Sequence, residues 1–167
     1  MSQAIAYPIT SRTYVALAIA RGIAAANGHA DLTGCHVALG ILREGENPAV
    51  AALHRAGVSL RQLRRDLEAA LPKPGHVRFG EVTLPATPGE HEIVEGAFAE
   101  AVSRDNEFVG NQHLLLVLLR QPDSAAGQIF ARHRVTYETA ADHLRAILSG
   151  DGWPGVIAKP NDTSAAD

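Results

Sequence analysis

The sequence contains a single cysteine, Cys35, among its 167 residues, which excludes an internal disulfide and is typical of a reducing compartment. It also lacks a basic excess, because 15 lysines and arginines stand against 18 acidic residues, so it is poorly suited to neutralise nucleic-acid phosphates. Uninterrupted apolar runs such as Leu114 to Leu119 are far too short to cross a bilayer. We therefore expect a cytoplasmic protein that binds neither nucleic acid nor a membrane.

Motifs that carry chemistry are also scarce. No Gly-x-x-x-x-Gly-Lys-Ser/Thr loop occurs, so the chain has no phosphate-cradling element and no ATPase of its own. Cys35 and His36 are adjacent, but neighbouring residues rarely aim their side chains at a common point. There is no second cysteine, and the other histidines show no spacing typical of metal ligands. We therefore expect no metal site, no cofactor and no enzymatic activity.

What the chain does contain is a tandem repeat. His36 to Arg43 and His113 to Arg120 share a histidine, two leucines and an arginine in register, at an offset of 77 residues. The same offset, without a gap, pairs Thr10 with Thr87, Ala20 with Ala97, Ala24 with Ala101, Val58 with Val135 and Leu67 with Leu144. Such a duplication assigns most of the sequence to one architecture, and it predicts two equivalent sites.

Apolar periodicity and capping signals predict four helices in each repeat. The predicted helices cover 12–26, 36–42, 48–57 and 60–71 in the first repeat, and 88–104, 113–119, 125–133 and 137–148 in the second. The predicted caps are Thr10 or Ser11, Thr33 or Gly34, Ser59, Thr87, Asn111 and Thr136. The sequence therefore predicts an all-α fold of two pseudo-symmetric four-helix repeats.

The second helix of each repeat is nearly all apolar and leaves no polar face for water, so it should lie at the centre of the fold. The residues expected in the core on this ground are Leu39, Leu42, Leu116 and Leu119. The chain then divides into a lead (1–8), a first repeat (9–71), a linker (72–86), a second repeat (87–148) and a flexible tail (149–167), with both repeats forming one domain. The linker carries three prolines, so it is not helical throughout, and an extended piece is expected at 77–84.

One specific pattern occurs twice in the chain. It consists of a helix ending near Gly28-His29, a short loop and an apolar helix within 34–45, and its second copy lies at 109–120. In this pattern the chain resembles the Clp N-terminal domain, the substrate- and adaptor-binding front of Clp/Hsp100 unfoldases, over about residues 9–148. The resemblance implies an all-α, non-catalytic module. It also implies protein partners, namely Clp ATPase or protease components, adaptors or client peptides.

The resemblance implies binding sites at the starts of the two apolar helices. The candidate residues are Thr33, Gly34, Cys35 and His36 in the first repeat and Gly110, Asn111, Gln112 and His113 in the second. In relatives that receive phosphoarginine-marked clients, a glutamate at each site takes the guanidinium, and the adjoining helix start takes the phosphate. Here those glutamate positions are Cys35 and Gln112. Helix-start amides still attract an anion, but losing the carboxylate should weaken each site by roughly tenfold to a hundredfold.

Two kinds of function fit the sequence. The leading interpretation is a non-catalytic protein that binds client segments or adaptors and feeds or regulates a Clp ATP-dependent protease in trans. The alternative is a decoy or structural interaction protein that has lost client binding, or the severed N-terminal domain of a full-length Clp ATPase. Met1 at the start and the polar residues at the end favour a standalone protein, and we expect a monomer.

Overall fold

The computed structural model describes residues 7–76 and 87–149, which form eight α-helices. They are α1 (Ser11–Ala26), α2 (Gly34–Glu44), α3 (Pro48–Arg55), α4 (Leu60–Ala69), α5 (Pro88–Ser103), α6 (Asn111–Leu119), α7 (Ala125–Arg132) and α8 (Tyr137–Leu148). These described residues contain no strand, only an isolated parallel bridge between Ile9 and Val109. The predicted all-α fold is therefore confirmed. The extended piece expected at 77–84, and nearly all of the expected tail, lie outside the described residues.

Six of the helices begin where a side chain accepts the backbone N–H of the residue three positions further on. The capping residues are Thr10, Asn47, Ser59, Thr87, Ser124 and Thr136. They form three pairs related by the offset of the repeat. The prediction that Asn111 caps the central helix of the second repeat is wrong. Gly110 is the cap and Asn111 is the first helical residue, because the acceptor for the cap is supplied from within the helix, as described below.

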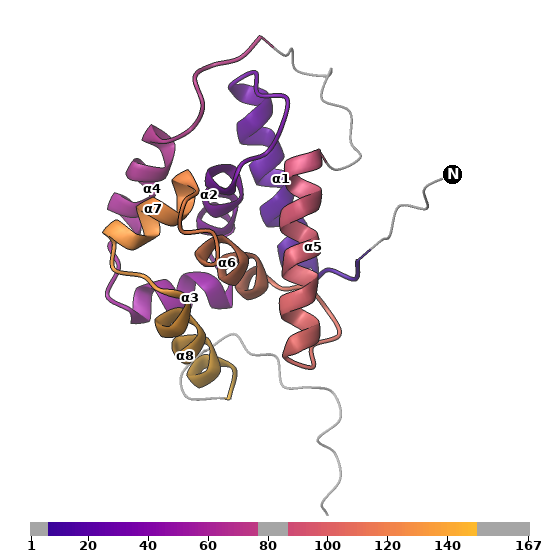
Figure 1. Cartoon of the computed structure of the whole chain (residues 1–167), viewed down its shortest axis with the longest axis vertical. Helices are drawn as coiled ribbons and strands as arrows, with labels where there is room; N and C mark the ends of the chain where they lie inside the picture. The colour runs from indigo at the N-terminus through magenta and orange to yellow at the C-terminus, as the bar shows by residue number, and fades with distance from the viewer. Residues whose placement is uncertain (1–6, 77–86, 150–167) are drawn as a thin grey trace, which may run out of the picture.

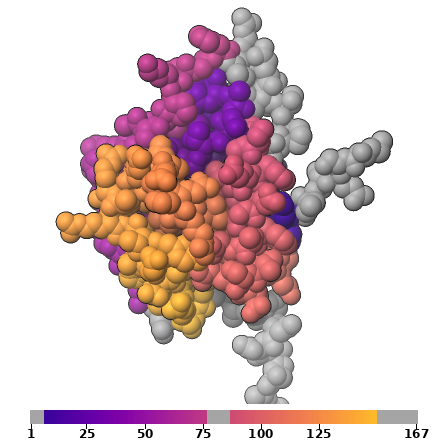
Figure 2. Space-filling view, viewed as in Figure 1, coloured from indigo at the N-terminus to yellow at the C-terminus, as the bar shows by residue number. Residues whose placement is uncertain are grey.

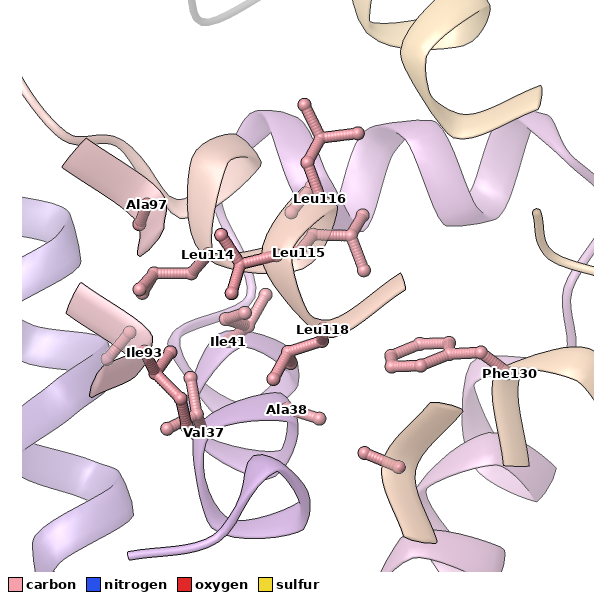
Figure 3. Packing of buried hydrophobic residues seen from close by; sticks show 14 of the residues in the cluster. Val37, Ala38, Ile41, Ile93, Ala97, Leu114, Leu115, Leu116, Leu118 and Phe130 are labelled. Atoms are coloured by element: carbon pink, nitrogen blue, oxygen red, sulfur yellow. The ribbon is translucent and has the colours of Figure 1, made fainter. Parts of the chain in front are cut away.

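The two apolar helices α2 and α6 lie at the centre, and the other helices surround them (Figure 1). All residues of 35–41 and of 113–118 are buried. In Figure 3, Leu116 and Leu118 point to opposite sides of α6, so this helix is packed all round. Leu39 and Leu116 are in the core as predicted. Leu42 and Leu119 pack against the core but are only partly buried, because they lie towards the ends of their helices, so the prediction that they are core residues is wrong.

The two repeats interlock. The third helix of each repeat packs against the central helix of the other, since α3 contacts α6 and α7 contacts α2. Further contacts join α3 to α8 and α4 to α7. Figure 3 shows Phe130 of α7 pointing toward Ala38 of α2 and Leu118 of α6. One cluster of buried hydrophobic residues therefore contains side chains from both halves of the chain.

The start of the first helix in each repeat is attached to the loop before the central helix of the other repeat. At α1, the N–H of Thr10 donates to the carbonyl oxygen of Val109 (3.0 Å), whose own N–H donates to Pro8 (2.8 Å). At α5, the N–H of Leu32 donates to Oγ1 of Thr87 (3.2 Å). Leu32 and Val109 are equivalent in the repeat. The molecule therefore contains two crossed attachments at equivalent positions of the repeat, one through backbone groups alone and one through a threonine side chain.

The attachment at α5 has two additional polar contacts. The N–H of Gly89 donates to both carboxylate oxygens of Asp31, at 3.0 and 3.2 Å. The buried carboxylate of Glu90 pairs with the guanidinium of Arg21 on α1, with Nε to Oε2 at 2.9 Å. Because Glu90 is only 1% exposed, removing its partner would leave a buried charge unpaired, which is strongly destabilising.

Two buried histidines close the starts of the central helices. Nδ1 of His36 accepts the N–H of Thr33 (2.9 Å), and Nδ1 of His113 accepts the N–H of Gly110 (2.8 Å). Each histidine is the third residue of its helix and therefore takes the position from which a capping-box side chain reaches back to the cap. Burial is the main cause that lowers the pKa of both rings to about 4.

Because Nδ1 accepts in both rings, the proton of each neutral imidazole is on Nε2. His36 then donates from Nε2 to Nδ1 of His29 (2.9 Å), and His29 donates from its own Nε2 to the carbonyl oxygen of Lys73 (3.1 Å). His113 donates from Nε2 to Oδ1 of Asn106 (2.8 Å). His29 and Asn106 are again equivalent in the repeat. Both rings are thus fully hydrogen-bonded in the neutral form.

Replacing Gly89 tests the close approach at α5. A Cβ at this position would lie 2.2 Å from the carbonyl oxygen of Leu32, so we expect Gly89→Ala to lower the free energy of unfolding by about 1–3 kcal/mol. The matched control is Gly22→Ala in α1, where a Cβ meets nothing within 4 Å and should stabilise by about 0.5–1 kcal/mol. Urea unfolding measures both, and equal effects in the two variants would contradict the close approach.

The neutral histidines predict acid sensitivity. Their pKa values of about 4 lie below the ordinary 6.5, so between these values the unfolded chain binds more protons than the folded protein. The stability that each neutral histidine contributes is complete above about pH 6.5. As the pH falls towards 4, the free energy of unfolding decreases by about 1.4 kcal/mol per pH unit for each histidine. We expect urea unfolding across this range to show the decline. His36→Asn and His113→Asn keep an acceptor for the cap but not the titration, so an unchanged slope in the double variant would contradict the assignment.

Candidate functional site

The crossed attachments place the start of each central helix beside the start of the other repeat's first helix. We define the first helix-start site as residues 33–36 of α2 with 87–90 of α5. The second helix-start site consists of residues 110–113 of α6 with 10–13 of α1. Because helix starts present unpaired N–H groups and the positive end of the helix dipole, both sites are candidates for anion binding. They differ, however, in how many of those N–H groups are already used.

At the first helix-start site, the start of α5 is closed by the chain itself. In the first turn of α5, Pro88 has no N–H, Gly89 donates to Asp31, and Glu90 donates to Oγ1 of Thr87 (3.4 Å). The carboxylate of Asp31 therefore occupies the place that an external anion would take at this helix start. Asp31 also accepts from the N–H of Leu32 (2.8 Å), which fixes it there.

The second helix-start site is open. The residue equivalent to Asp31 is Phe108, which is 53% exposed and supplies no carboxylate. In the first turn of α1, Thr13 donates to Oγ1 of Thr10 (3.2 Å). Among the described residues, the N–H groups of Ser11 and Arg12 have no acceptor. These are the orphan donors to which an anion binds at a helix start.

In the first repeat, the candidates from the sequence are mostly inaccessible. Cys35 is 1% exposed, and burial raises the pKa of its thiol to about 11, so the thiol stays protonated and is a poor nucleophile or metal ligand. His36 is fully buried. Thr33 and Gly34 are partly exposed, but Gly34 lies against α6 and α7, since a Cβ there would be 3.1 Å from Leu118 and from Ala126.

In the second repeat, the candidates form a different arrangement. Gly110 and His113 are buried, whereas Gln112 is partly exposed and its amide folds back over Gly110, where a Cβ would lie 2.2 Å from its Oε1. Asn111 is 2% exposed, and neither its Nδ2 nor its Oδ1 has a partner in the part of the chain that the structure describes. A buried amide without partners costs about 1–3 kcal/mol and calls for an explanation.

The sequence does not identify Asp31, Ser11 or Arg12 as contributors to these sites. An acidic residue two positions before a helix cap carries no local signal that it will accept from another helix. Asp31 and Gly89 are 58 positions apart in the chain, so this pairing depends on the tertiary fold. Among the described residues no group of three histidine, cysteine or acidic side chains is suited to hold a metal ion. The same residues include no helix that is both long and apolar enough to cross a membrane.

Comparison with curated proteins shows relatives among Clp ATPases. The chain is 27% identical over 156 residues to the negative regulator of genetic competence ClpC/MecB of Bacillus subtilis, a match that covers 93% of this chain and 19% of that protein. It is 26% identical over 142 residues to the chaperone protein ClpB of Oceanobacillus iheyensis, covering 85% of this chain and 17% of that protein. The chain thus spans less than a fifth of the length of these relatives.

Solved structures show the same fold. The N-domain of ClpV from Vibrio cholerae matches with a TM-score of 0.70 at 17% identity, covering 87% of each chain. The Hsp104 N-terminal domain from Candida albicans matches with a TM-score of 0.66 at 15% identity, covering 87% of this chain and 94% of that one. Residues 8–129 and 86–150 match the family described as the Clp repeat (R) N-terminal domain. Because these matches extend over most of the sequence, the chain belongs to the Clp repeat N-terminal domain family.

Proposed function

We propose that this chain is a non-catalytic binding module that captures an anionic protein segment at the second helix-start site and feeds or regulates a Clp ATP-dependent protease in trans. The observation that carries the proposal is the difference between the two helix starts. The N–H groups of Gly89 and Glu90 at α5 are accepted within the chain, whereas no acceptor among residues 7–76 and 87–149 binds those of Ser11 and Arg12 at α1. This difference favours the start of α1 over the start of α5 as the place where the anion binds.

The chemistry of the second helix-start site suits a guanidinium-linked phosphate. The free N–H groups at α1 provide donors for the phosphate, and Gln112 stands where the family resemblance puts the carboxylate for the guanidinium. A glutamine amide oxygen accepts an N–H bond, but without a charge it contributes less than a carboxylate does. The buried amide of Asn111 lies at the same helix start and has no hydrogen-bond partner among the described residues. The favoured ligand is therefore a phosphoarginine side chain, bound more weakly than by a site with glutamate.

The alternative is a decoy that occupies adaptors or Clp subunits without receiving clients. It is favoured by the loss of both glutamate positions and by the burial of Cys35. A degradation assay separates the two roles, using a Clp ATPase and peptidase with a phosphoarginine-marked client. Under our proposal the chain changes the degradation rate of the marked client but not that of the unmarked client. A decoy changes both rates equally.

Calorimetric titration with free phosphoarginine tests the site directly. We expect one molecule bound per chain, and Gln112→Glu should bind at least tenfold more tightly because it restores the carboxylate. The matched control is Gln128→Glu, which makes the same change of charge at an exposed position of α7. If Gln112→Glu does not increase the affinity for phosphoarginine, or if both variants increase it equally, then Gln112 does not face the ligand.

A second variant tests Asn111. Asn111→Ala removes a buried amide that has no protein partner, so the free energy of unfolding without ligand should stay the same or increase. We also expect the affinity of Asn111→Ala for phosphoarginine to fall, because the amide would serve as a partner for the bound ligand. Thermal unfolding with and without phosphoarginine measures both effects. A loss of stability together with unchanged affinity would assign Asn111 to the fold alone.

A further inference from the structure

A cluster of polar side chains in the second repeat joins the ends of α5 and α6 to the start of α8 and shares no residue with either helix-start site. The hydroxyl of Tyr137 donates to Oε2 of Glu100 (2.9 Å) and accepts from Nη2 of Arg104 and Nη2 of Arg120, both at 2.8 Å. Nε of Arg120 also donates to Oε1 of Glu100. We call these four residues the Arg120 cluster. Their equivalents in the first repeat are Ile23, Asn27, Arg43 and Leu60, so only the arginine is common to both copies.

The cluster holds an excess of positive charge. Two guanidinium groups face the single carboxylate of Glu100, whose side chain is 6% exposed. Burial alone would raise the pKa of Glu100, but hydrogen bonds from Arg120 and Tyr137 outweigh it and hold the pKa below its ordinary value. The carboxylate therefore stays ionised. One positive charge remains uncompensated within the cluster.

Arg120 is the part of the cluster that reaches solvent. Its side chain is 58% exposed, and its guanidinium carbon lies 4.1 Å from the centre of the Tyr137 ring, which fixes the plane of the cation. Nε and Nη2 are used within the cluster, and no acceptor among the described residues binds Nη1. A fixed, half-exposed guanidinium with a free N–H edge is suited to bind a carboxylate.

Two hollows open beside this cation. One has a volume of about 500 Å³ and is lined by Arg120, Tyr137 and mainly apolar residues, among them Leu119, Pro122, Ala131 and Val135, with Glu138 also contributing. The other, of about 440 Å³, lies between α5 and α6, where Arg120 meets Gly96, Ala99 and Val117. Figure 2 shows that α5, α7 and α8 form one continuous part of the face in view. The first hollow is large enough for a bulky side chain.

From this geometry we infer a second peptide site, at which Arg120 binds the C-terminal carboxylate of a polypeptide whose last side chain is apolar. The apolar side chain occupies the hollow lined by Leu119, Ala131 and Val135, and the preceding residues leave along the hollow between α5 and α6. Charge favours a C-terminus as the occupant. In a C-terminal residue a carboxylate lies directly beside the last side chain, and in the site the guanidinium of Arg120 lies directly beside the apolar hollow. The site extends the proposed peptide-binding role, but it shares no residue with the second helix-start site.

The test is fluorescence anisotropy with an N-terminally labelled hexapeptide that ends in leucine, prepared as the free acid and as the C-terminal amide. We expect the free acid to bind at least tenfold more tightly than the amide. Arg120→Gln should reduce the affinity for the acid to that for the amide, whereas Arg43→Gln, at the equivalent position of the first repeat, should change neither. Equal binding of the acid and the amide, or no binding of either, would overturn the inference.

A second pair of variants keeps the test decisive if Arg120→Gln fails to fold around Glu100. Ala131→Phe fills the apolar hollow from an exposed position of α7 and leaves the Arg120 cluster intact. Ala125→Phe makes the same change at an exposed position of α7 that does not line the hollow. Only Ala131→Phe should weaken binding of the free acid by at least tenfold. Unchanged binding would overturn the inference, whereas phosphoarginine titration of the same variants reports separately on the helix-start site.

Discussion

The burial of two helices that have no polar face is the constraint on which the rest of the structure depends. Each of these helices begins beside the core, and the N–H of its cap residue, Thr33 or Gly110, is accepted by the protein. His36 and His113 do this as neutral rings at 0% and 1% exposure. A carboxylate at the same depth would have to be desolvated. A neutral imidazole accepts with one nitrogen and still donates with the other to the preceding loop.

This arrangement explains why the two repeats are inseparable in the described structure. The loops that receive the donors of His36 and His113 also carry Leu32 and Val109, to which the first helices of the opposite repeats are attached. A change in either loop therefore acts on a central helix of its own repeat and on the first helix of the other. The same geometry builds each helix-start site from both repeats, which neither half of the chain can do alone.

The sequence predicted the features that depend on local chemistry. Apolar periodicity and capping residues located the eight helices of the described structure, because six of their caps bond only three positions away. The cap of α6 was misassigned because its acceptor is a histidine rather than the cap's own side chain. Asp31 to Gly89 and Arg21 to Glu90 join residues 58 and 69 positions apart. No periodicity or spacing signals such pairs, so the difference between the two helix-start sites emerges only from the fold.

The duplication shows which positions the fold constrains and which it leaves free. At positions that pack in the core or complete a backbone turn or hydrogen bond, the equivalent residues of the two repeats play the same structural role even when their identities differ. Asp105 adopts the positive φ of its equivalent Gly28, at 55° and 68°, and Asn106 accepts from its histidine as His29 does. Where the side chain faces a helix start or the surface, the copies diverge. Asp31 corresponds to Phe108, and Leu60 to Tyr137. The backbone hydrogen bonds and the packing that the two repeats share are met by equivalent residues. The positions that diverge can therefore give each half its own recognition chemistry.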